Sequence, residues 1–342
     1  VVSIALLLAA CQVIEVEGPE TMPPSPTKRS PAQEQLAAMI LNTQGDIAPV
    51  HDVVMSREGT IYYLFSTGLG IPIRCSDDMV RWRLCGKVFA TYPDWVGQAI
   101  PGVESLWAPD VLFHEGRYFV YYAASTFGSN RSLIGLASNV TLDPKSEDYE
   151  WVDEGEVISS QRSDNYNAID ANLTFDANGQ PWLAFGSFWS GIKLVRVDPA
   201  TLKPAPGAEL ISIAANPGTT AIEGAYIIRR QGLYYLFISH DYCCRGVESS
   251  YKIKVGRSEA ITGPYVDRNG KTLMEGGGTL VYDGSERWRG PGHNSVYVEN
   301  GNYFMVYHAY DASAAGTPTL RIEQLNWDEG GWPLSPSAAL GR

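Results

Sequence analysis

The stretch DVLFHEGRYFVYYAAS (110–125) contains a short apolar run, a turn that ends in Gly116, and an aromatic-rich segment. β-Branched and aromatic residues favour strands, and a glycine in the turn accepts the positive φ that tight hairpins need. The same pattern recurs with turn glycines at 59, 179, 232 and 301. Together with Gly116, these five glycines are separated in chain order by 57, 63, 53 and 69 residues. A repeat with room for four strands is typical of a propeller blade. We therefore predict an all-β, five-bladed β-propeller that fills residues 35–342 as one domain, with an irregular β-sandwich as the alternative.

Ionisable residues stand where the first strand of each repeat begins. They are Asp52, Asp110, Asp170, Glu223 and His293. The innermost strands of a propeller run beside its central channel, so equivalent positions meet at one mouth of that channel. An aspartate at a strand start can also serve only to cap a turn. Five ionisable side chains in register are harder to explain in that way, because crowded like charges cost free energy and are more often functional.

Several carboxylates around one pocket can divide the work of acid–base catalysis. Glycoside hydrolysis uses such a pair, one as acid and the other as base or nucleophile. Aromatic rings that could stack on sugars lie near the repeat starts, although core packing is the alternative for each of them. These aromatic candidates are Trp107, Phe127, Trp189, Tyr242 and Trp288.

The chain is acidic, with a net charge of −12 and a pI of about 4.9. Nucleic-acid binding depends on clustered Lys and Arg, so the charge argues against a nucleic-acid partner. A polyanionic substrate is also disfavoured, and a neutral ligand fits better.

The amino-terminal stretch VVSIALLLAA (1–10) is too short to span a bilayer and matches the apolar part of a secretory signal. The basic stretch that should precede it is missing, so we expect the chain to begin inside a longer precursor. Cys11 follows in the manner of a bacterial lipoprotein, with an ordinary signal peptide as the alternative. Residues 12–34 are rich in Pro, Glu, Ser and Thr and predict an extended tether. The protein is then expected to cross the inner membrane and to sit at the periplasmic or outer cell surface, touching the membrane only through a lipid on Cys11.

The remaining four cysteines form two groups. Cys75 and Cys85 flank a turn-like segment and could bridge in an oxidising compartment. Cys243 and Cys244 are adjacent and could form a vicinal disulfide or remain two thiols. No cysteine or histidine spacing of the structural zinc type occurs in the sequence.

Long stretches of the chain resemble the family 43 glycoside hydrolases, and among them the endo-acting α-1,5-L-arabinanases. The matching stretches include LWAPDV (106–111), NAIDANLTFD (167–176), FGSFWSGIKL (185–194), AIEGAYII (221–228) and RWRGPGHNSV (287–296). They span nearly the whole body of the chain, and the longest are specific. The family's fold is a five-bladed β-propeller, in agreement with the repeat.

The resemblance implies a role for each matching residue. Asp52 matches the general base, Glu223 the general acid, and Asp170 a third carboxylate that orients the substrate and raises the pKa of the acid. The implied reaction is a single displacement with inversion. His293 matches a histidine beside a largely water-coordinated calcium ion. Substrate contacts are expected, partly from the resemblance and partly from the aromatic candidates above, at Asn167, Ser187, Phe188, Trp189, Trp107 and Phe127.

The chain departs from the family's pattern where Val53 and Ala171 replace prolines that often follow the base and the middle aspartate. These changes alter loop stiffness more than chemistry. The function implied is endo-hydrolysis of α-1,5-L-arabinan by a monomer. The alternatives are exo-action, α-arabinofuranosidase or β-xylosidase activity, and a carbohydrate-binding propeller without catalysis.

Overall fold

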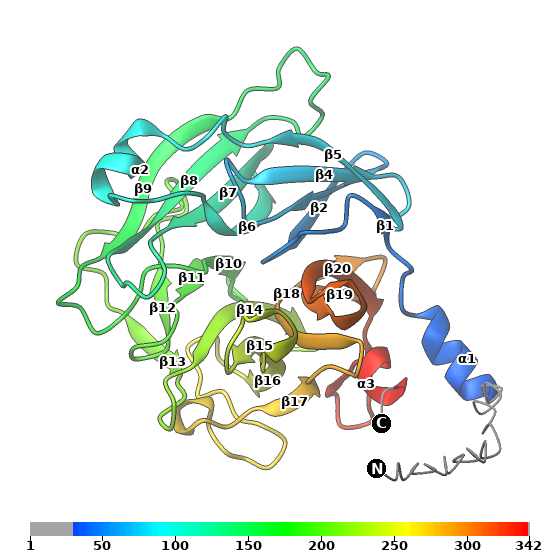
Figure 1. Cartoon of the computed structure of the whole chain (residues 1–342). Coiled ribbons are helices and arrows are strands. Elements are labelled where there is room, and N and C mark those ends of the chain that lie inside the picture. Colours follow the sequence, from blue (N-terminus) through cyan, green and yellow to red (C-terminus); the bar gives the residue numbers. More distant parts are fainter. Residues whose placement is uncertain (1–29, 341–342) are drawn as a thin grey trace, which may run out of the picture.

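Five sheets, antiparallel except where β1 pairs with β5, are arranged around a central axis in this computed structural model, which describes residues 30–340 (Figure 1). This arrangement confirms the predicted five-bladed propeller and excludes the irregular sandwich. The predictions for the signal-like segment 1–10, for Cys11 and for residues 12–29 of the tether lie outside the described residues.

Each blade is built from consecutive strands. The first blade contains β1 (Gln44–Gly45), β2 (Val54–Glu58), β3 (Ile61–Phe65), β4 (Pro72–Ser76) and β5 (Arg81–Lys87). The second contains β6 (Trp107–His114), β7 (Arg117–Ala124), β8 (Ser132–Asn139) and β9 (Val152–Ser160). The third contains β10 (Asn172–Phe175), β11 (Pro181–Phe185), β12 (Ile192–Arg196) and β13 (Ile211–Ala214). The fourth contains β14 (Ile222–Arg230), β15 (Leu233–His240), β16 (Lys252–Ser258) and β17 (Thr279–Tyr282). The fifth contains β18 (Trp288–Glu299), β19 (Asn302–Asp311) and β20 (Thr317–Gln324).

Short elements decorate this ring. A small sheet pairs β21 (Asn326–Trp327) with β22 (Pro333–Leu334). The helices are α1 (Pro31–Ala38), α2 (Asp94–Ala99) and α3 (Pro336–Leu340), with 3₁₀ turns η1 (Gly246–Glu248), η2 (Leu273–Glu275) and η3 (Ala312–Ala314). Among residues 30–340, none of the helices is both long and apolar enough to cross a membrane.

The predicted glycine turns join the two innermost strands of every blade. All five glycines have positive φ, from 58° to 83°. The segments after the turns form β3, β7, β11, β15 and β19, as predicted. The local sequence therefore fixes the innermost hairpin of each blade.

Apolar side chains fill the space between neighbouring blades. Successive residues of a strand point to opposite faces of its sheet, so each blade contributes to two interfaces. On β11, Leu183 packs toward the second blade and Ala184 toward the fourth. Five buried clusters result, one at each interface, and they hold the inner strands around the axis.

The amino-terminal segment closes the ring against the fifth blade. The Leu41 amide donates to the Ile322 carbonyl at 2.9 Å, and the Gln324 amide donates to the Met39 carbonyl at 2.9 Å. The segment thus takes the outer position beside the three strands of that blade. Glu299 adds an ion pair with Arg57, so the first and last blades are also tied near their turns.

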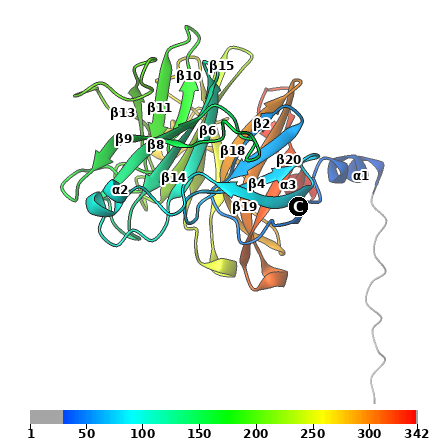
Figure 2. The same cartoon turned by 90° about the horizontal axis from the view of Figure 1, so that it is seen from above.

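The tether prediction is wrong for residues 31–34, which form the first half of α1. Ser30 caps this helix, because its hydroxyl accepts from the Gln33 amide while the Gln33 side chain accepts from the Ser30 amide. Pro31 suits the first helical position. The helix has no buried residue and lies at the side of the ring (Figure 2).

Candidate active site

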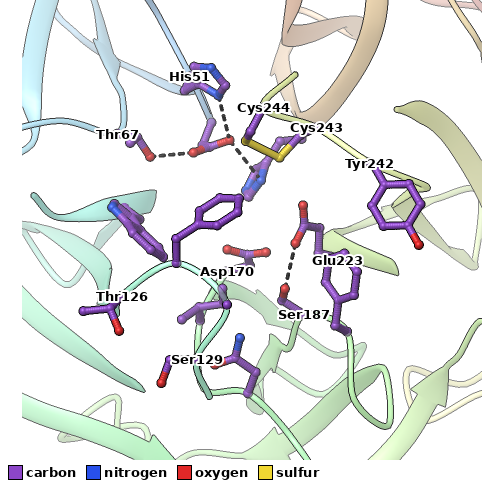
Figure 3. Close-up of a pocket in the computed structure, with 18 of the residues that line it drawn as sticks. His51, Thr67, Thr126, Ser129, Asp170, Ser187, Glu223, Tyr242, Cys243 and Cys244 are labelled. Atoms are coloured by element: carbon purple, nitrogen blue, oxygen red, sulfur yellow. Dashed lines mark hydrogen bonds and ion pairs between the residues drawn. A yellow bond between two sulfur atoms is a disulfide. The ribbon is translucent and has the colours of Figure 1, made fainter. Parts of the chain in front are cut away.

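A pocket of about 810 Å³ opens where the inner strands of the blades begin (Figure 3). All ten predicted site residues line it. They are Asp52, Asp170, Glu223, His293, Asn167, Ser187, Phe188, Trp189, Trp107 and Phe127. The structure thus brings residues that are far apart in sequence into one space.

Backbone conformation aims the polar side chains into the pocket. Asp52, Asp170 and His293 have φ values of 52°, 62° and 48°, in the left-handed region that non-glycine residues seldom adopt. In the fourth blade the left-handed residue is Gly224, one position after Glu223, and a Cβ there would lie 3.2 Å from the His293 ring. Strained conformations of this kind gather at functional sites.

Asp52 is held ionised by its neighbours. Thr67 donates a 2.6 Å hydrogen bond to Asp52 Oδ2, and His293 Nδ1 lies 3.2 Å from Oδ1. Burial by itself would raise the pKa of Asp52, but His293 first, and then the imidazoles of His51 and His308 and the Thr67 hydrogen bond, lower this pKa to about 2. This carboxylate can therefore accept a proton at any ordinary pH.

Glu223 lies in the opposite electrostatic environment. Burial raises the pKa of Glu223, and the nearby Asp52 charge raises it further. Ser187 donates to Oε2 at 2.7 Å and Tyr251 donates to Oε1 at 2.8 Å, and both hydrogen bonds partly offset the rise. A carboxyl group that keeps its proton is suited to donate it.

Asp170 lies beside the same acid. Its Oδ2 accepts from the Gly224 amide at 3.2 Å. Burial, and after it the charges of Glu223 and Asp52, raise the pKa of Asp170 to about 7 against the lowering effect of His293 and the Gly224 amide. Because two neighbouring carboxylates resist ionising together, Asp170 helps keep Glu223 protonated.

Aromatic side chains form the walls of the pocket. Phe127 is 85% exposed and Trp189 is 38% exposed, which is unusual for rings of that size and leaves their faces free for a ligand. Tyr242 also lines the pocket and packs against Phe188, with ring centroids 6.0 Å apart. Sugar rings stack on such surfaces through their apolar faces.

The family model described as Glycosyl hydrolases family 43 matches residues 48–333, most of the chain. The chain belongs to glycosyl hydrolase family 43. The Extracellular endo-alpha-(1->5)-L-arabinanase 1 of Bacillus subtilis (strain 168) is 47% identical over 290 residues, which cover 83% of this chain and 87% of that protein. The Extracellular exo-alpha-(1->5)-L-arabinofuranosidase ArbA of Cellvibrio japonicus (strain Ueda107) is 44% identical over 296 residues, which cover 83% and 85%. The solved structure of Cellvibrio cellulosa alpha-L-arabinanase complexed with arabinohexaose superposes with a TM-score of 0.81 at 43% identity, covering 84% of this chain and 96% of that one.

Within residues 30–340, the possible metal ligands that lie together do not by themselves form a calcium cage. Among the described residues, the cluster of possible ligands is His51, Asp52 and His308, whose ligand atoms lie within 4.8 Å of one another. The Asp52 amide already donates to His308 Nδ1 at 3.2 Å, and Thr67 occupies Asp52 Oδ2. Calcium takes about six to eight oxygen ligands, and two imidazoles with one carboxylate do not provide them. Calcium beside His293 therefore stays a prediction of the resemblance, and no step below uses it.

The expectation that Asp110 faces the pocket is wrong. Ala108 has the left-handed φ of 41° that marks the mouth position in the other blades, so Asp110 comes two residues later. The pairing of β6 with β7 shifts register between Trp107 and Asp110, and Asp110 lies beyond that irregularity. Asp110 is 3% exposed, and its Oδ2 accepts from the Leu173 amide at 2.7 Å.

Asp110 belongs instead to a set of bonds that join the inner strands below the pocket. The Ile227 amide donates to Asn172 Oδ1 at 2.8 Å, and Ser295 Oγ donates to the Val53 carbonyl at 2.8 Å. These contacts cross from the third blade to the fourth and from the fifth to the first. They hold the inner strands together at the centre of the ring (the hub), beneath the layer of catalytic carboxylates.

Trp288 was the other expectation that the structure overturns. It lies outside the pocket, where the guanidinium groups of Arg287 and Arg321 stack on its ring at 4.6 Å and 4.2 Å from the centroid. Trp288 is the first residue of β18, five positions before His293, and this distance along the strand carries it away from the pocket mouth.

Three residues that support the carboxylates were not recognised as such from the sequence. Thr67 and Tyr251 hold Asp52 and Glu223, and Ser187, predicted to contact substrate, donates to Glu223. His308 is fully buried, and burial lowers the pKa of His308 well below its ordinary value, so it stays neutral beside Asp52. The sequence offered one signal for His308: in YHAYDA (307–312) a histidine stands among the aromatic and apolar residues of a predicted strand.

Proposed function

We propose that this protein hydrolyses internal α-1,5-L-arabinofuranosidic links of arabinan. The observation that carries the proposal is that Asp52 and Glu223 lie in one aromatic-walled pocket whose surroundings lower the pKa of Asp52 and raise the pKa of Glu223. The named activities of the relatives supply the sugar, since both curated relatives described above are named for action on α-1,5-linked L-arabinose. A neutral substrate also suits a chain with a net charge of −12.

The proposed reaction is a single displacement with inversion. Asp52 takes a proton from a water molecule as the water oxygen bonds to the anomeric carbon. The glycosidic C–O bond breaks on the opposite side, and Glu223 gives its proton to the departing oxygen. Asp170 orients the sugar and, through its charge, keeps Glu223 protonated until that step.

Replacement of the acid provides the direct test. Glu223→Gln keeps the size and polarity of the side chain but cannot donate a proton as an acid. We expect reducing-sugar release from linear arabinan to fall by about 10²–10⁴-fold, which is the usual contribution of a general acid. Wild-type rates in the variant would refute the assignment, and absence of activity in both proteins would favour a non-catalytic sugar-binding propeller.

The endo mode is proposed over the exo mode, although named relatives act in each way. Product sizing over time separates the two: mixed oligosaccharides appear early for endo-action, whereas a single product appears throughout for exo-action. Parallel assays with aryl α-arabinofuranoside and β-xyloside test the two other activities considered, and we expect little release from either.

We also propose that the chain is exported, anchored by a lipid on Cys11 and monomeric. The relatives' names describe extracellular enzymes, and disulfides between Cys75 and Cys85 and between Cys243 and Cys244 suit an oxidising compartment. Fatty-acid labelling of the full precursor should be lost in Cys11→Ser, and labelling that persists would refute the anchor. Light scattering should give the mass of one chain.

A further inference from the structure

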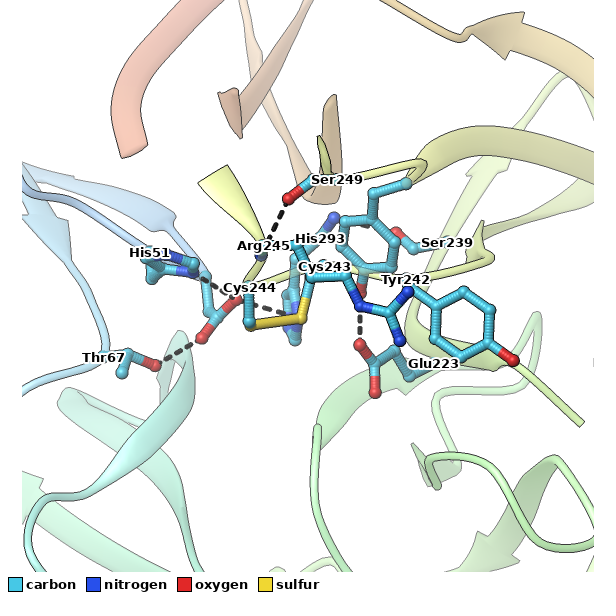
Figure 4. The surroundings of a disulfide bond; sticks show 12 residues. His51, Thr67, Glu223, Ser239, Tyr242, Cys243, Cys244, Arg245, Ser249 and His293 are labelled. Atoms are coloured by element: carbon cyan, nitrogen blue, oxygen red, sulfur yellow. Dashed lines mark hydrogen bonds and ion pairs between the residues drawn. A yellow bond between two sulfur atoms is a disulfide. The ribbon is translucent and has the colours of Figure 1, made fainter. Parts of the chain in front are cut away.

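The loop between β15 and β16 carries a disulfide between adjacent residues, Cys243 and Cys244, on the wall of the catalytic pocket. Its sulfurs lie between His51 and Thr67 on one side and Glu223 and Tyr242 on the other (Figure 4). Cys244 is exposed and Cys243 is partly exposed, so both are open to a bound ligand. The reaction described above leaves this group without a role.

This disulfide is poorly placed to stabilise the fold. A disulfide stabilises mainly by restricting the unfolded chain, and the effect grows with the length of the loop that it closes. Cys75–Cys85 joins residues ten positions apart, whereas Cys243–Cys244 joins neighbours and closes no further chain. A local role in the pocket is therefore the better explanation.

The loop is held in place by other contacts. The Cys244 amide donates to the Tyr310 hydroxyl at 2.7 Å, and the Arg245 amide donates to Ser249 Oγ at 3.0 Å. The Arg245 guanidinium stacks on the Tyr242 ring at 4.3 Å from its centroid. The disulfide is thus presented on a preorganised surface, which reduces the entropic cost of binding.

The surface that the disulfide offers is compact, uncharged and polarisable. It lies among carboxylates, imidazoles and hydroxyls that can hydrogen-bond to sugar hydroxyls, and it offers none of these groups itself. The matching part of a sugar is the apolar C–H face of a furanose ring.

We propose that the Cys243–Cys244 disulfide packs against the furanose ring of an arabinan chain bound across Asp52 and Glu223, and so positions the linkage for cleavage. The inference rests on the proposed function and deepens it. It makes the disulfide a positioning group rather than a catalytic one.

Protection from reduction tests the contact directly. In the Glu223→Gln background, calorimetry first establishes that arabinohexaose binds. Thiol labelling and mass spectrometry then follow the reduction of each disulfide by a phosphine, with and without the hexaose. We expect bound hexaose to slow reduction of Cys243–Cys244 by about fivefold or more and to leave Cys75–Cys85 unaffected, since occupied surface is closed to the reductant.

Hexaose that binds without slowing reduction of Cys243–Cys244 would overturn the inference while leaving the proposed function intact. Failure of the hexaose to bind would instead overturn the proposed function, and this inference with it. The calorimetric step therefore distinguishes the two failures.

A matched pair of variants gives a second readout. Cys243→Ala/Cys244→Ala should raise KM for arabinan by about fivefold with little change in Tm, because a packing contact with the substrate is lost. Cys75→Ala/Cys85→Ala should lower Tm and leave KM unchanged. A vicinal variant that lowers Tm but keeps the wild-type KM would show a purely structural role and refute the proposal.

Discussion

His293 Nδ1 lies 3.2 Å from Asp52 Oδ1, although 241 positions separate the two residues in the chain. Burial alone would lower the pKa of His293, but the three carboxylates around it raise that pKa, which favours the positively charged imidazolium. A positive charge on His293 stabilises the ionised form of the buried Asp52. Several predictions about the roles of the pocket residues depend on this relationship.

Removal of that charge should move the whole pH profile. The His293→Gln variant loses an attraction that lowers the pKa of Asp52, Glu223 and Asp170 alike. The base then ionises at higher pH and the acid holds its proton to higher pH, so both limbs of kcat/KM shift upward. A pH–rate profile that coincides with that of the wild type would contradict this account.

Thr67→Val should weaken the base. The Thr67 hydroxyl donates to Asp52 Oδ2 at 2.6 Å and accepts from the Ala108 amide at 2.8 Å, and valine keeps the shape but neither bond. The lost bonds are worth about 1–3 kcal/mol, so we expect kcat to fall by about 10–100-fold. Thr67→Ser keeps the hydroxyl and is the control; equal losses in both variants would point to packing instead.

Tyr251→Phe should affect only the acid side of the mechanism. The Tyr251 hydroxyl donates to Glu223 at 2.8 Å and thereby lowers the pKa of that carboxyl. Without this bond the pKa of Glu223 rises, and the alkaline limb of the kcat/KM profile moves to higher pH. The control is Tyr265→Phe, a buried tyrosine that bonds to the Ile261 carbonyl away from the pocket; it should lower Tm without moving either limb.

Asp110→Ala should destabilise the hub. The change leaves the buried Leu173 amide without its acceptor, at a cost of about 1–3 kcal/mol in the free energy of unfolding. Asp110→Asn keeps an acceptor oxygen and should cost less. The free energies are measured by denaturant unfolding, and a loss of activity in folded Asp110→Asn would show that this residue does serve the reaction.

The pH dependence of stability gives a separate check on Asp110. Burial raises the pKa of Asp110 to about 7 from an ordinary value of 3.8, so the folded protein binds more protons than the unfolded chain between these values. The stability contributed by this group is therefore present below about pH 4 and is lost as the pH rises to about 7. In Asp110→Asn, the free energy of unfolding should decrease less between about pH 4 and pH 7 than it does in the wild type. An equal decrease in both proteins would show that Asp110 does not titrate in this range.

The outline of the fold could be predicted from the sequence because its signals are local. A glycine in a hairpin, such as Gly232, and a run of β-branched and aromatic residues after it act over a few neighbouring positions. Five such units imply a ring, and a ring implies convergence, which is why Asp52, Asp170 and Glu223 could be grouped without coordinates. The capping box of Ser30 and Gln33 is also a local signal. It was not recognised because the surrounding prolines favoured the prediction of an extended tether.

What remained was decided by contacts across the ring. Asp110 comes two residues after Ala108, which takes the position that Asp52, Asp170 and His293 hold in their blades. Spacing alone cannot detect this shift, because the register irregularity beside it exists only in the pairing of β6 with β7. The protonation of Asp52 depends on Thr67, 15 residues away, and on His293, 241 residues away. Charge, burial and hydrogen bonding act through space over a few ångströms, so they exist only once the last blade has closed against the first.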